Sequence, residues 1–406
     1  MKVGLPEWAR RLRAERESRG WGRADLAREM LKAAEPYTLP GMKSIVASIK
    51  GHEVGRHRPG DPYRPLYRTI YGKSDHELFG GSPEGMIIDH ASFGDLLLTG
   101  ARRARPVDAD HVLALRDANR HLVALDNAYG GGELVAIACR AFRNAGAGLA
   151  SGRCPPAVER DLQAAVGETG EIAAWIAYDA DRQALSRQLI HEAMMISRLA
   201  GDRGMELLQF SHLSMQGVYL HRSREALSLA DSVIDDRRLS GRTSTLFQMR
   251  RARALAQLDE RRDALKALSA AHAHLGDGVG SSDPPWAWWI DDHELAYHEA
   301  VCHGDLGSWD RAVEVIGRAV EGCEAGRTRC SFNDRAQQLD ILVRAGAWRE
   351  AEPVLVTLLA EVGEVGSHRT DNLLTTVADR LGRSKAALPS TLSDATAELR
   401  TRLTGG

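Results

Sequence analysis

Aromatic residues are scarce in this sequence, and cysteines are few and scattered. Phe, Trp and Tyr together make up 5% of the 406 residues, whereas hydrophobic residues of all kinds make up 43%. The five cysteines form no Cys-x-x-Cys pair, and no histidine cluster accompanies them at the spacing of a metal site. Their odd number and their spacing favour reduced thiols over a disulfide framework. We therefore expect no bound metal and no cofactor.

Long apolar runs and enzyme motifs are missing as well. No stretch approaches the roughly 20 residues that a membrane-spanning helix needs, and residues 1–14 are amphipathic and charged, unlike a secretory leader. We therefore expect no membrane partner and a cytoplasmic location. The sequence contains no Ser/His/Asp order and no dinucleotide-binding phrase, and its 15 histidines are scattered. We expect a protein that is not an enzyme and has no catalytic residues.

Charge is distributed unevenly along the chain, although the formal net charge is only -2. Residues 1–73 contain 16 Lys and Arg against 8 Asp and Glu, whereas the remainder contains 37 against 47. A basic head on an acidic body indicates that only the head meets a polyanion such as DNA. A chance fluctuation or a solvated basic face is the alternative interpretation.

Ala, Leu, Arg and Glu dominate the composition, and apolar residues recur at helical spacing, which together predict an all-α fold. The head is expected to contain five short helices, at residues 6–19, 23–34, 41–50, 63–71 and 75–79. The second of these is expected to turn Leu26, Met30 and Leu31 inward. Glycine, serine and proline from residue 80 onward predict a linker. We expect a first domain at 1–80, a linker at 81–107, a helical joining segment at 108–167 and a repeat domain at 168–406.

The third short helix carries the candidate DNA-binding residues. Its apolar residues Ile45, Val46 and Ile49 are expected to face the core, which leaves a polar outward face. Short polar and cationic side chains on a helix in the major groove reach base edges, while neighbouring cations hold backbone phosphates. For any single residue, a solvated charge is the alternative. The DNA-binding candidates are Lys43, Ser44, Ser48, Lys50, Arg56, His57 and Arg58.

The head resembles the helix-turn-helix domain of actinobacterial Cro/lambda-repressor-like (XRE-type) regulators. Two features depart from that family: His52 stands at its usual tryptophan, and about nine residues separate the second and third helices instead of three or four. The resemblance implies that the third helix enters the major groove of double-stranded DNA. It rests on Glu53, Gly55, Arg56, Pro59, Tyr63-Arg64, Leu66-Tyr67, Tyr71-Gly72 and Glu77-Leu78-Phe79-Gly80.

Small residues repeat along the second half of the chain. Ser186, Ala226, Ala264, Ala312 and Ala351 follow one another at spacings of 40, 38, 48 and 39 residues. The position 12 residues before each of them is also small, except for Leu339. A third small or apolar position recurs 7 residues after each of them. These offsets resemble those of tetratricopeptide (TPR) repeats. The resemblance implies a right-handed α-solenoid built from helical hairpins, with a concave groove.

The same resemblance assigns residues to the groove. An Asn amide such as that of Asn333 binds a peptide backbone through both its donor and its acceptor. Packing between helices is the alternative for Trp175 and the methionines. Trp286, Trp288 and Trp289 either form a lid or pack in a core under a loop, and packing is favoured. The ligand-binding candidates are Trp175, Tyr178, Met215, Met249, Arg253, Glu294, Tyr297, Asn333 and Asp340.

The joined architecture resembles the RRNPP family of peptide-pheromone receptors. That resemblance implies a quorum-sensing transcriptional regulator that binds DNA as a homodimer and a signal peptide or small-molecule effector in its repeats. Ligand and DNA are coupled in such a protein only if the ligand prefers one dimer arrangement. The alternative is a TPR protein-interaction scaffold whose helix-turn-helix has degenerated.

Overall fold

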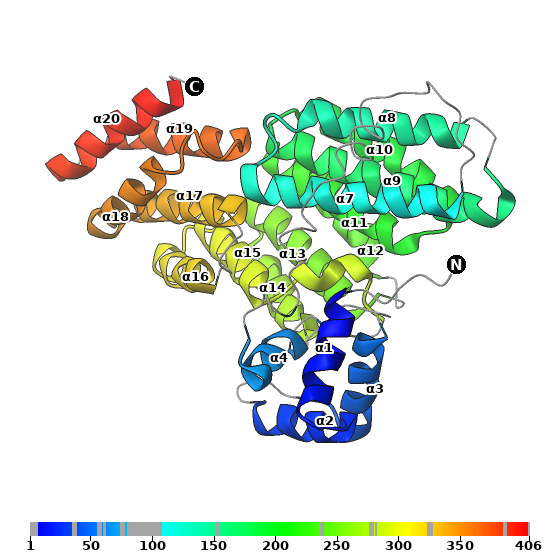
Figure 1. The fold of residues 1–406 in the computed structure, drawn as a ribbon. Helices are drawn as coiled ribbons and strands as arrows, with labels where there is room; N and C mark the ends of the chain where they lie inside the picture. Colours follow the sequence, from blue (N-terminus) through cyan, green and yellow to red (C-terminus); the bar gives the residue numbers. More distant parts are fainter. Residues whose placement is uncertain are drawn as a thin grey trace. The chain divides into compact units, whose positions relative to one another are not determined.

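The computed structural model describes residues 7–34, 39–54, 59, 62–73, 78, 108–150, 154–235, 239–275, 280, 282–322, 328–384 and 388–404. Every regular element in these ranges is a helix, which confirms the expected all-α fold (Figure 1). The chain divides into two compact units: Met1–His90 with Asp277–Ser281, and Ala91–Gly276 with Ser282–Gly406. The boundary expected at residue 80 and the linker expected at 81–107 lie outside the described residues.

In its described residues, the first unit contains four short amphipathic helices. Their apolar sides form one core, in which Leu12, Leu26 and Ile45 are fully buried. Leu31 was expected to join them but is 41% exposed, because it lies at the edge of the apolar stripe that Leu26 and Met30 define. The fifth helix expected at 75–79 lies outside the described residues except for Leu78, which is buried. The helices are α1 (Glu7–Ser18), α2 (Arg23–Lys32), α3 (Met42–Glu53) and α4 (Tyr63–Tyr71).

A buried carboxylate joins three of these helices. Glu53, at the end of α3, is 1% exposed. Its Oε2 accepts hydrogen bonds from Arg16 of α1 at 3.1 Å and from Arg23 of α2 at 2.7 Å. Arg16 also donates to the backbone oxygen of Trp21 at 2.7 Å. A buried charge is tolerated only when it is paired and hydrogen-bonded, so this ion cluster fixes how α1, α2 and α3 meet.

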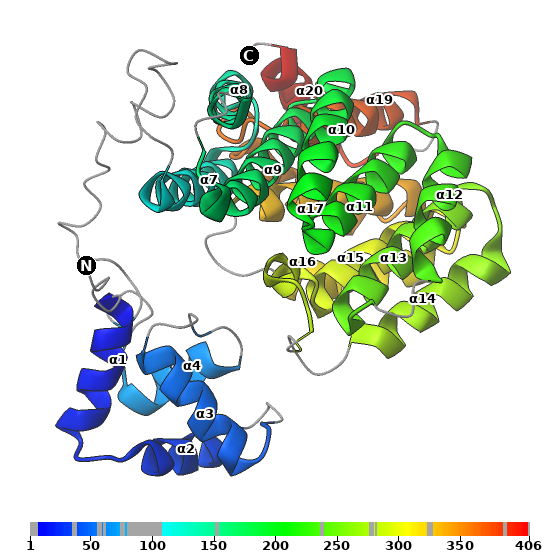
Figure 2. The ribbon, with the colours of Figure 1, turned by 90° about the vertical axis from the view of Figure 1, so that its right-hand side faces the viewer.

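Over the ranges that the structure describes, the second unit has two opening helices followed by six helix pairs. Within each pair the two helices pack together, and the first helix of a pair also contacts the first helix of the next pair (Figure 2). A 3-10 turn, η1 (Pro285–Trp289), precedes the fourth pair. The opening helices are α7 (Ala109–Tyr129) and α8 (Val135–Ala150), and the pairs are α9 (Pro156–Asp179) with α10 (Gln183–Ala200), α11 (Arg203–Tyr219) with α12 (Ser223–Ile234), α13 (Gly241–Gln257) with α14 (Arg261–Leu275), α15 (Asp292–Asp305) with α16 (Trp309–Gly322), α17 (Thr328–Ala345) with α18 (Trp348–Leu359), and α19 (His368–Arg383) with α20 (Ser390–Thr404).

The repeated small residues mark where the helices of a pair approach most closely. Ser186 is fully buried, and its hydroxyl donates to the backbone oxygen of Ala174 at 2.8 Å. In the next pair, Ser214 donates in the same way to Ala226 at 2.8 Å. The residues expected at the opening of each second helix are all 0% exposed: Ser186, Ala226, Ala264, Ala312 and Ala351.

The turn inside each of the first five pairs, from α9 with α10 to α17 with α18, has one left-handed residue. It lies five positions before the small residue that opens the second helix, and φ there is between 54° and 73°. Three of the five are not glycine, and Asp and His tolerate this conformation better than most residues. The left-handed positions are Asp181, His221, Asp259, Gly307 and Gly346.

Three consecutive glycines bring distant parts of the second unit together. Gly132 donates its backbone N–H to the oxygen of Gly366 at 2.7 Å, and Gly366 donates to the oxygen of Tyr129 at 2.7 Å. A Cβ on Gly131 would lie 2.5 Å from the backbone oxygen of Ile176 in α9. In addition, α17 contacts α7 and α19 contacts α9 (Figure 1). The first helices therefore form a closed circuit of contacts from α9 to α19 and back to α9.

Candidate functional site

The exposed face of α3 carries the DNA-binding candidates that the structure describes. Lys43, Ser44 and Lys50 are exposed and Ser48 is partly buried, whereas Ile45 on the opposite side is fully buried. Positions 43 and 50 are seven residues apart, so they share one side of the helix. Arg56, His57 and Arg58 lie outside the described residues.

The two lysines of α3 differ from two other exposed cations of the first unit, Lys32 and Arg28. Lys32 pairs with Glu29 at 2.7 Å, and Arg28 pairs with Asp25. In the described part of the chain, no carboxylate forms an ion pair with Lys43 or Lys50. Their charges are therefore available to an external anion, whereas those of Lys32 and Arg28 are already compensated.

His52 occupies a core position and does not belong to the exposed face. Its ring is 3% exposed and packs against Tyr63 and Tyr67 with centroid distances of 5.3 and 5.8 Å. Burial raises the pKa of Tyr67 well above its ordinary value. The histidine at this position makes aromatic contacts in the core, so it affects packing and does not belong to the exposed face.

In the second unit, Trp175 and Tyr178 of α9 each lie under a cation from a distant helix. The guanidinium of Arg329 is 4.9 Å from the Trp175 ring centroid, and that of Arg369 is 5.2 Å from the Tyr178 centroid. Trp175 Nε1 donates to Asp126 Oδ2 at 2.9 Å. These two aromatic residues are therefore held in cation–π contacts that belong to the fold.

Arg253, Glu294 and Tyr297 come together around His298. His298 Nε2 lies 3.0 Å from Glu294 Oε1 and 2.9 Å from Arg250 Nη1. Burial would raise the pKa of Glu294, but the contact with His298 and the charge of Arg250 bring it down to about 2. Burial lowers the pKa of His298 to about 4. At neutral pH, Glu294 is therefore ionised and His298 is neutral.

We use the term inner surface for the region formed by Trp175, Tyr178, Arg253, Glu294 and Tyr297. Three arginines of this inner surface were not predicted from the sequence. Arg250 is 2% exposed, and burial lowers its pKa to about 10. Arg329 and Arg369 retain side-chain exposures of 12% and 14%. Arg369 interacts electrostatically with both Tyr178 and Tyr297. No local motif announces these residues, because Arg250 meets His298 on the next helix pair, and Arg329 and Arg369 meet Trp175 and Tyr178 only when the circuit of helices closes.

Asn333 and Asp340 of α17 are occupied by contacts within the unit. The Asn333 amide donates to Asp334 Oδ1 and accepts from Thr370 Oγ1, both at 3.5 Å. Asp340 is 4% exposed, lies 3.4 Å from Arg344 and also pairs with Arg380. Both residues therefore tie α17 to its surroundings.

The methionines and the tryptophan loop take packing positions. Met249 is fully buried in a hydrophobic cluster to which Trp286 and Trp289 contribute, so it does not face a groove. Met215 is partly buried. Trp288, by contrast, is 53% exposed. For Met249, Trp286 and Trp289, packing between helices therefore matches the structure better than a groove position. The loop that carries the two tryptophans covers the cluster between α13 and α15.

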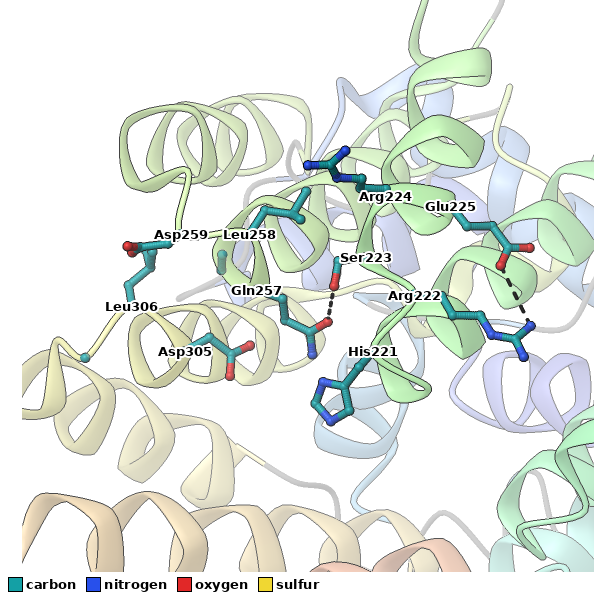
Figure 3. A pocket seen from close by; sticks show the side chains of 12 residues that line it. His221, Arg222, Ser223, Arg224, Glu225, Gln257, Leu258, Asp259, Asp305 and Leu306 are labelled. Atoms are coloured by element: carbon teal, nitrogen blue, oxygen red, sulfur yellow. Dashed lines mark hydrogen bonds and ion pairs between the residues drawn. The ribbon is translucent and has the colours of Figure 1, made fainter.

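A surface cavity of about 1040 Å³ lies at the turns of three successive pairs (Figure 3). Its lining includes His221, Ser223, Gln257, Asp259 and Asp305. Ser223 donates to Gln257 at 2.7 Å. Burial raises the pKa of Asp305. This cavity was not predicted from the sequence, although three of its lining residues, His221, Asp259 and Gly307, are the left-handed residues of their turns.

The cavity meets the inner surface through the contact between Asp305 and Arg253. Asp305 Oδ2 lies 3.9 Å from Arg253 Nε, and among the described residues neither atom has a hydrogen-bond partner. Of the expected ligand-binding residues, Arg253 is therefore the one that meets a residue of the cavity wall.

One group of described side chains has the donor atoms of a metal site. The ligand atoms of His293, Cys330 and Asp334 all lie within 4.8 Å of one another. No metal was expected from the sequence, because a residue of α15 and two residues of α17 do not form a short metal-binding motif.

No protein-family model matches the chain, and neither a curated protein nor a solved structure matches it. Within the described ranges, no helix combines the length and the apolar character required to cross a bilayer.

Proposed function

We propose that the chain is a DNA-binding transcriptional regulator, with α3 as the element that enters the major groove. The observation that carries this proposal is the exposed face of α3, where Lys43 and Lys50 are not compensated by a described carboxylate. Cations of this kind neutralise phosphates and release the counterions bound to DNA. Ser44 and Ser48 lie between them and add hydroxyl groups that reach base edges.

The proposed regulator acts as a homodimer in the cytoplasm and responds to a small effector. Two copies on a palindromic site double the short sequence that one helix reads, with half-sites about one helical turn apart. The second unit supplies the effector site. A quorum-sensing role follows if the effector is a peptide that the producing cells release.

The cavity at the turns is a better effector site than the arginines of the inner surface. Removing one partner of a buried ion pair costs about 3–5 kcal/mol, and a ligand that displaced the pairs of Arg329 or Arg369 would have to overcome that cost. The cavity of about 1040 Å³ requires no such displacement, and its size is in the range of ligand sites. Its wall holds cationic side chains, including Arg222, and the carboxylates of Asp259 and Asp305, which suits a short zwitterionic peptide.

DNA binding is tested by selection of bound fragments and by salt titration. The full chain is expected to enrich a palindrome from sheared genomic DNA. In the variant Lys43→Gln/Lys50→Gln, the slope of log affinity against log salt should fall by about two units, one for each phosphate that the variant no longer neutralises. Lys266→Gln, an exposed change of the same charge on α14, is the control. An unchanged slope in the double variant contradicts the proposal and favours a protein-interaction scaffold.

The effector site is tested with a library of short linear peptides. Peptides that raise the melting temperature of the wild type are expected to lose most of that effect in Asp259→Asn. Asp263→Asn is the matched control, because Asp263 is exposed on α14 and does not line the cavity. Retained binding in Asp259→Asn, or a loss in both variants, assigns the peptide to another surface.

A further inference from the structure

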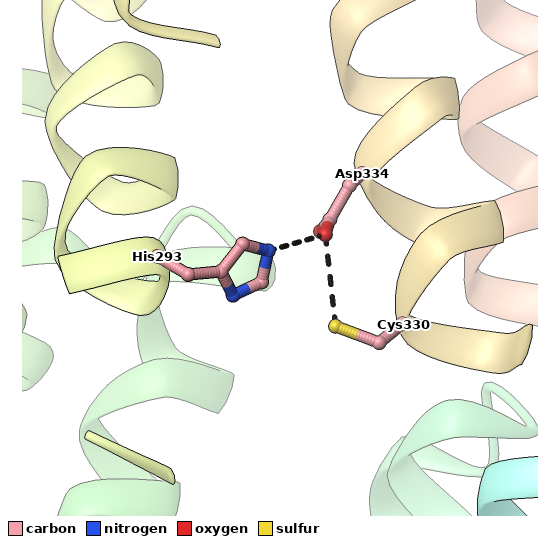
Figure 4. A group of neighbouring side chains, drawn as sticks. All are labelled: His293, Cys330 and Asp334. Atoms are coloured by element: carbon pink, nitrogen blue, oxygen red, sulfur yellow. Dashed lines mark hydrogen bonds and ion pairs between the residues drawn. The ribbon is translucent and has the colours of Figure 1, made fainter. Parts of the chain in front are cut away.

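Three side chains from two neighbouring helices converge between α15 and α17 (Figure 4). His293 Nε2 lies 2.8 Å from Asp334 Oδ2, and the Cys330 thiol donates to the same oxygen at 3.6 Å. Cys330 and Asp334 are four residues apart on α17, so their side chains lie on one face of that helix. His293 reaches them from the first turn of α15.

This group is shielded from solvent. The side chain of His293 is 9% exposed and that of Asp334 is 3% exposed. It is also separate from the cavity at the turns, whose lining contains none of the three residues. Cys330 is partly buried. A largely shielded cluster of one imidazole, one thiol and one carboxylate differs from the exposed acidic groups that commonly occur without a metal.

The donor set selects the class of ion. A thiolate with an imidazole favours Zn²⁺ or another late transition metal, whereas Mg²⁺ and Ca²⁺ prefer oxygen ligands. Zinc binds sulfur at about 2.3 Å and nitrogen or oxygen at about 2.0–2.2 Å, which places the ligand atoms of a tetrahedral ion roughly 3.5 Å apart. The distances of 2.8 and 3.6 Å bracket that separation. Small side-chain rotations are therefore enough to admit the ion.

We propose that His293, Cys330 and Asp334 bind one Zn²⁺ ion between α15 and α17. The imidazole binds through its Nε2 lone pair and the carboxylate through Oδ2. The thiol loses its proton to solvent and binds as thiolate, so one proton is released for each ion bound. Among the described residues three side chains supply ligands, which leaves one position of a tetrahedral ion for a further ligand such as water.

The site is connected to the inner surface through Asn333. Asn333 donates to Asp334 Oδ1, the carboxylate oxygen that zinc does not use, at 3.5 Å. Its amide also interacts with Tyr297 of α15. Partners that orient a ligating carboxylate contribute about 10–100-fold to metal affinity. Asn333→Ala is therefore expected to weaken zinc binding by about tenfold or more, without removing a ligand.

Metal binding is tested on the full chain, freed of metal with a chelator and titrated with Co²⁺ and then with Zn²⁺. We expect one equivalent of Co²⁺, a thiolate-to-cobalt charge-transfer band in the near ultraviolet, and displacement of cobalt by one equivalent of zinc. Zinc should also raise the melting temperature of the wild type, because it binds the folded state. Cys330→Ser and Asp334→Asn should each lose the band and the thermal shift.

Cys139→Ser is the matched control. Cys139 is also partly buried, but it lies on α8 and outside the three-residue group. It should retain the band and the stoichiometry. A wild type without a charge-transfer band overturns the proposal, and this result does not depend on whether any variant folds. Undiminished zinc binding by folded Cys330→Ser also overturns it. Neither measurement involves DNA or a peptide, so the outcome is independent of the proposed regulatory function.

Discussion

Arg369 donates from Nη2 to Asp179 Oδ1 at 3.2 Å, although 190 residues separate the two in the sequence. Asp179 is fully buried at the end of α9, and Ser367 also donates to its Oδ1, at 2.9 Å. Burial would lower the pKa of Arg369, but the groups of Tyr178 and Asp179 raise it above its ordinary value. The Arg369 guanidinium therefore remains charged, and its contact with Asp179 joins α19 to α9.

The first prediction concerns this pair. Asp179→Ala leaves the Arg369 guanidinium without its carboxylate in a buried position, and such changes cost about 3–5 kcal/mol of unfolding free energy. The measurement is urea denaturation followed by circular dichroism. Asp231→Ala is the control, because Asp231 and Arg251 form an ion pair with side-chain exposures of 46% and 30%. Pairs of that kind contribute about 1 kcal/mol or less. Equal losses in the two variants would show that the pair does not stabilise the closure.

The second prediction concerns the glycines at the contact of α7, α9 and the segment before α19. Gly131→Ala places a Cβ 2.5 Å from the backbone oxygen of Ile176, and backbone cannot move aside as a flexible side chain can. The variant should melt well below the wild type. Gly146→Ala provides a contrast of opposite sign, since nothing lies within 4 Å of its Cβ on α8. Replacement of a helical glycine by alanine stabilises by about 0.5–1 kcal/mol. Scanning calorimetry of both variants measures the difference.

The third prediction is a dependence of stability on pH that arises from His298. Its pKa falls from the ordinary 6.5 to about 4 in the folded chain, first because of burial, and Arg250 and Arg253 add to the effect while Glu294 opposes it. The unfolded chain therefore binds a proton at higher pH than the folded chain. The contribution of neutral His298 to stability is complete above about pH 6.5 and decreases as pH falls toward 4.

Glu294 acts in the same direction at lower pH, because its folded pKa of about 2 lies below its ordinary value of 4.5. His298→Gln should remove the part of the pH dependence of the unfolding free energy that falls between pH 6.5 and 4. The expected result is a smaller loss of unfolding free energy between pH 7.5 and 5 in the variant than in the wild type. Parallel pH profiles for the two proteins would contradict a neutral, buried His298.

The fourth prediction concerns Glu53 in the first unit. Glu53→Gln keeps the shape of the side chain but leaves Arg16 without a buried counter-charge, which costs about 3–5 kcal/mol. A small unit with a limited core does not absorb a loss of this size easily, so DNA binding should fail at a lower temperature. Glu17 pairs with Arg13 at 2.8 Å and also contacts Arg16 at 3.4 Å, but its side chain is exposed. Glu17→Gln should therefore change the melting temperature of the first unit much less than Glu53→Gln.

The transition of the second unit should stay in place in both of these variants, because Glu53 and Glu17 belong to the first unit. A shift of both transitions would show that the two units unfold together.

Local sequence patterns were sufficient to predict most of the helices. The fourth helix was expected at 63–71 and extends over Tyr63–Tyr71, because its apolar residues and Gly72 define both ends. A helix was expected to begin at Asp108, and Asp108 is the N-cap of α7, where its side chain accepts from His111 N. The small residues of the helix pairs were equally informative, since close approach of two helices restricts residue size wherever it occurs.

Long-range contacts account for what the sequence did not reveal. The run Gly130-Gly131-Gly132 lacks the flanking residues of a phosphate-binding loop, and its purpose depends on Gly366, which is more than 230 residues away. Arg329 and Arg369 were missed for the same reason. Met249 was assigned to a groove by its position in the repeat, and the loop that carries Trp286 buries it instead. Periodicity describes one helix pair and its neighbour, and it does not report a contact between the first pair and the last.

The backbone hydrogen bonds between Gly366 and the end of α7 alter how the second unit loses its structure. In an open array of helix pairs, each pair touches only its neighbours, and the terminal pairs fray first. Here α19, the first helix of the last pair, is adjacent to α9, so in the described part of the chain the first and last pairs are in contact. Fraying at either end would break contacts at both ends of the array simultaneously. Proteolysis and hydrogen exchange in this unit should therefore proceed by opening of the whole circuit rather than by progressive loss from the C-terminal helices.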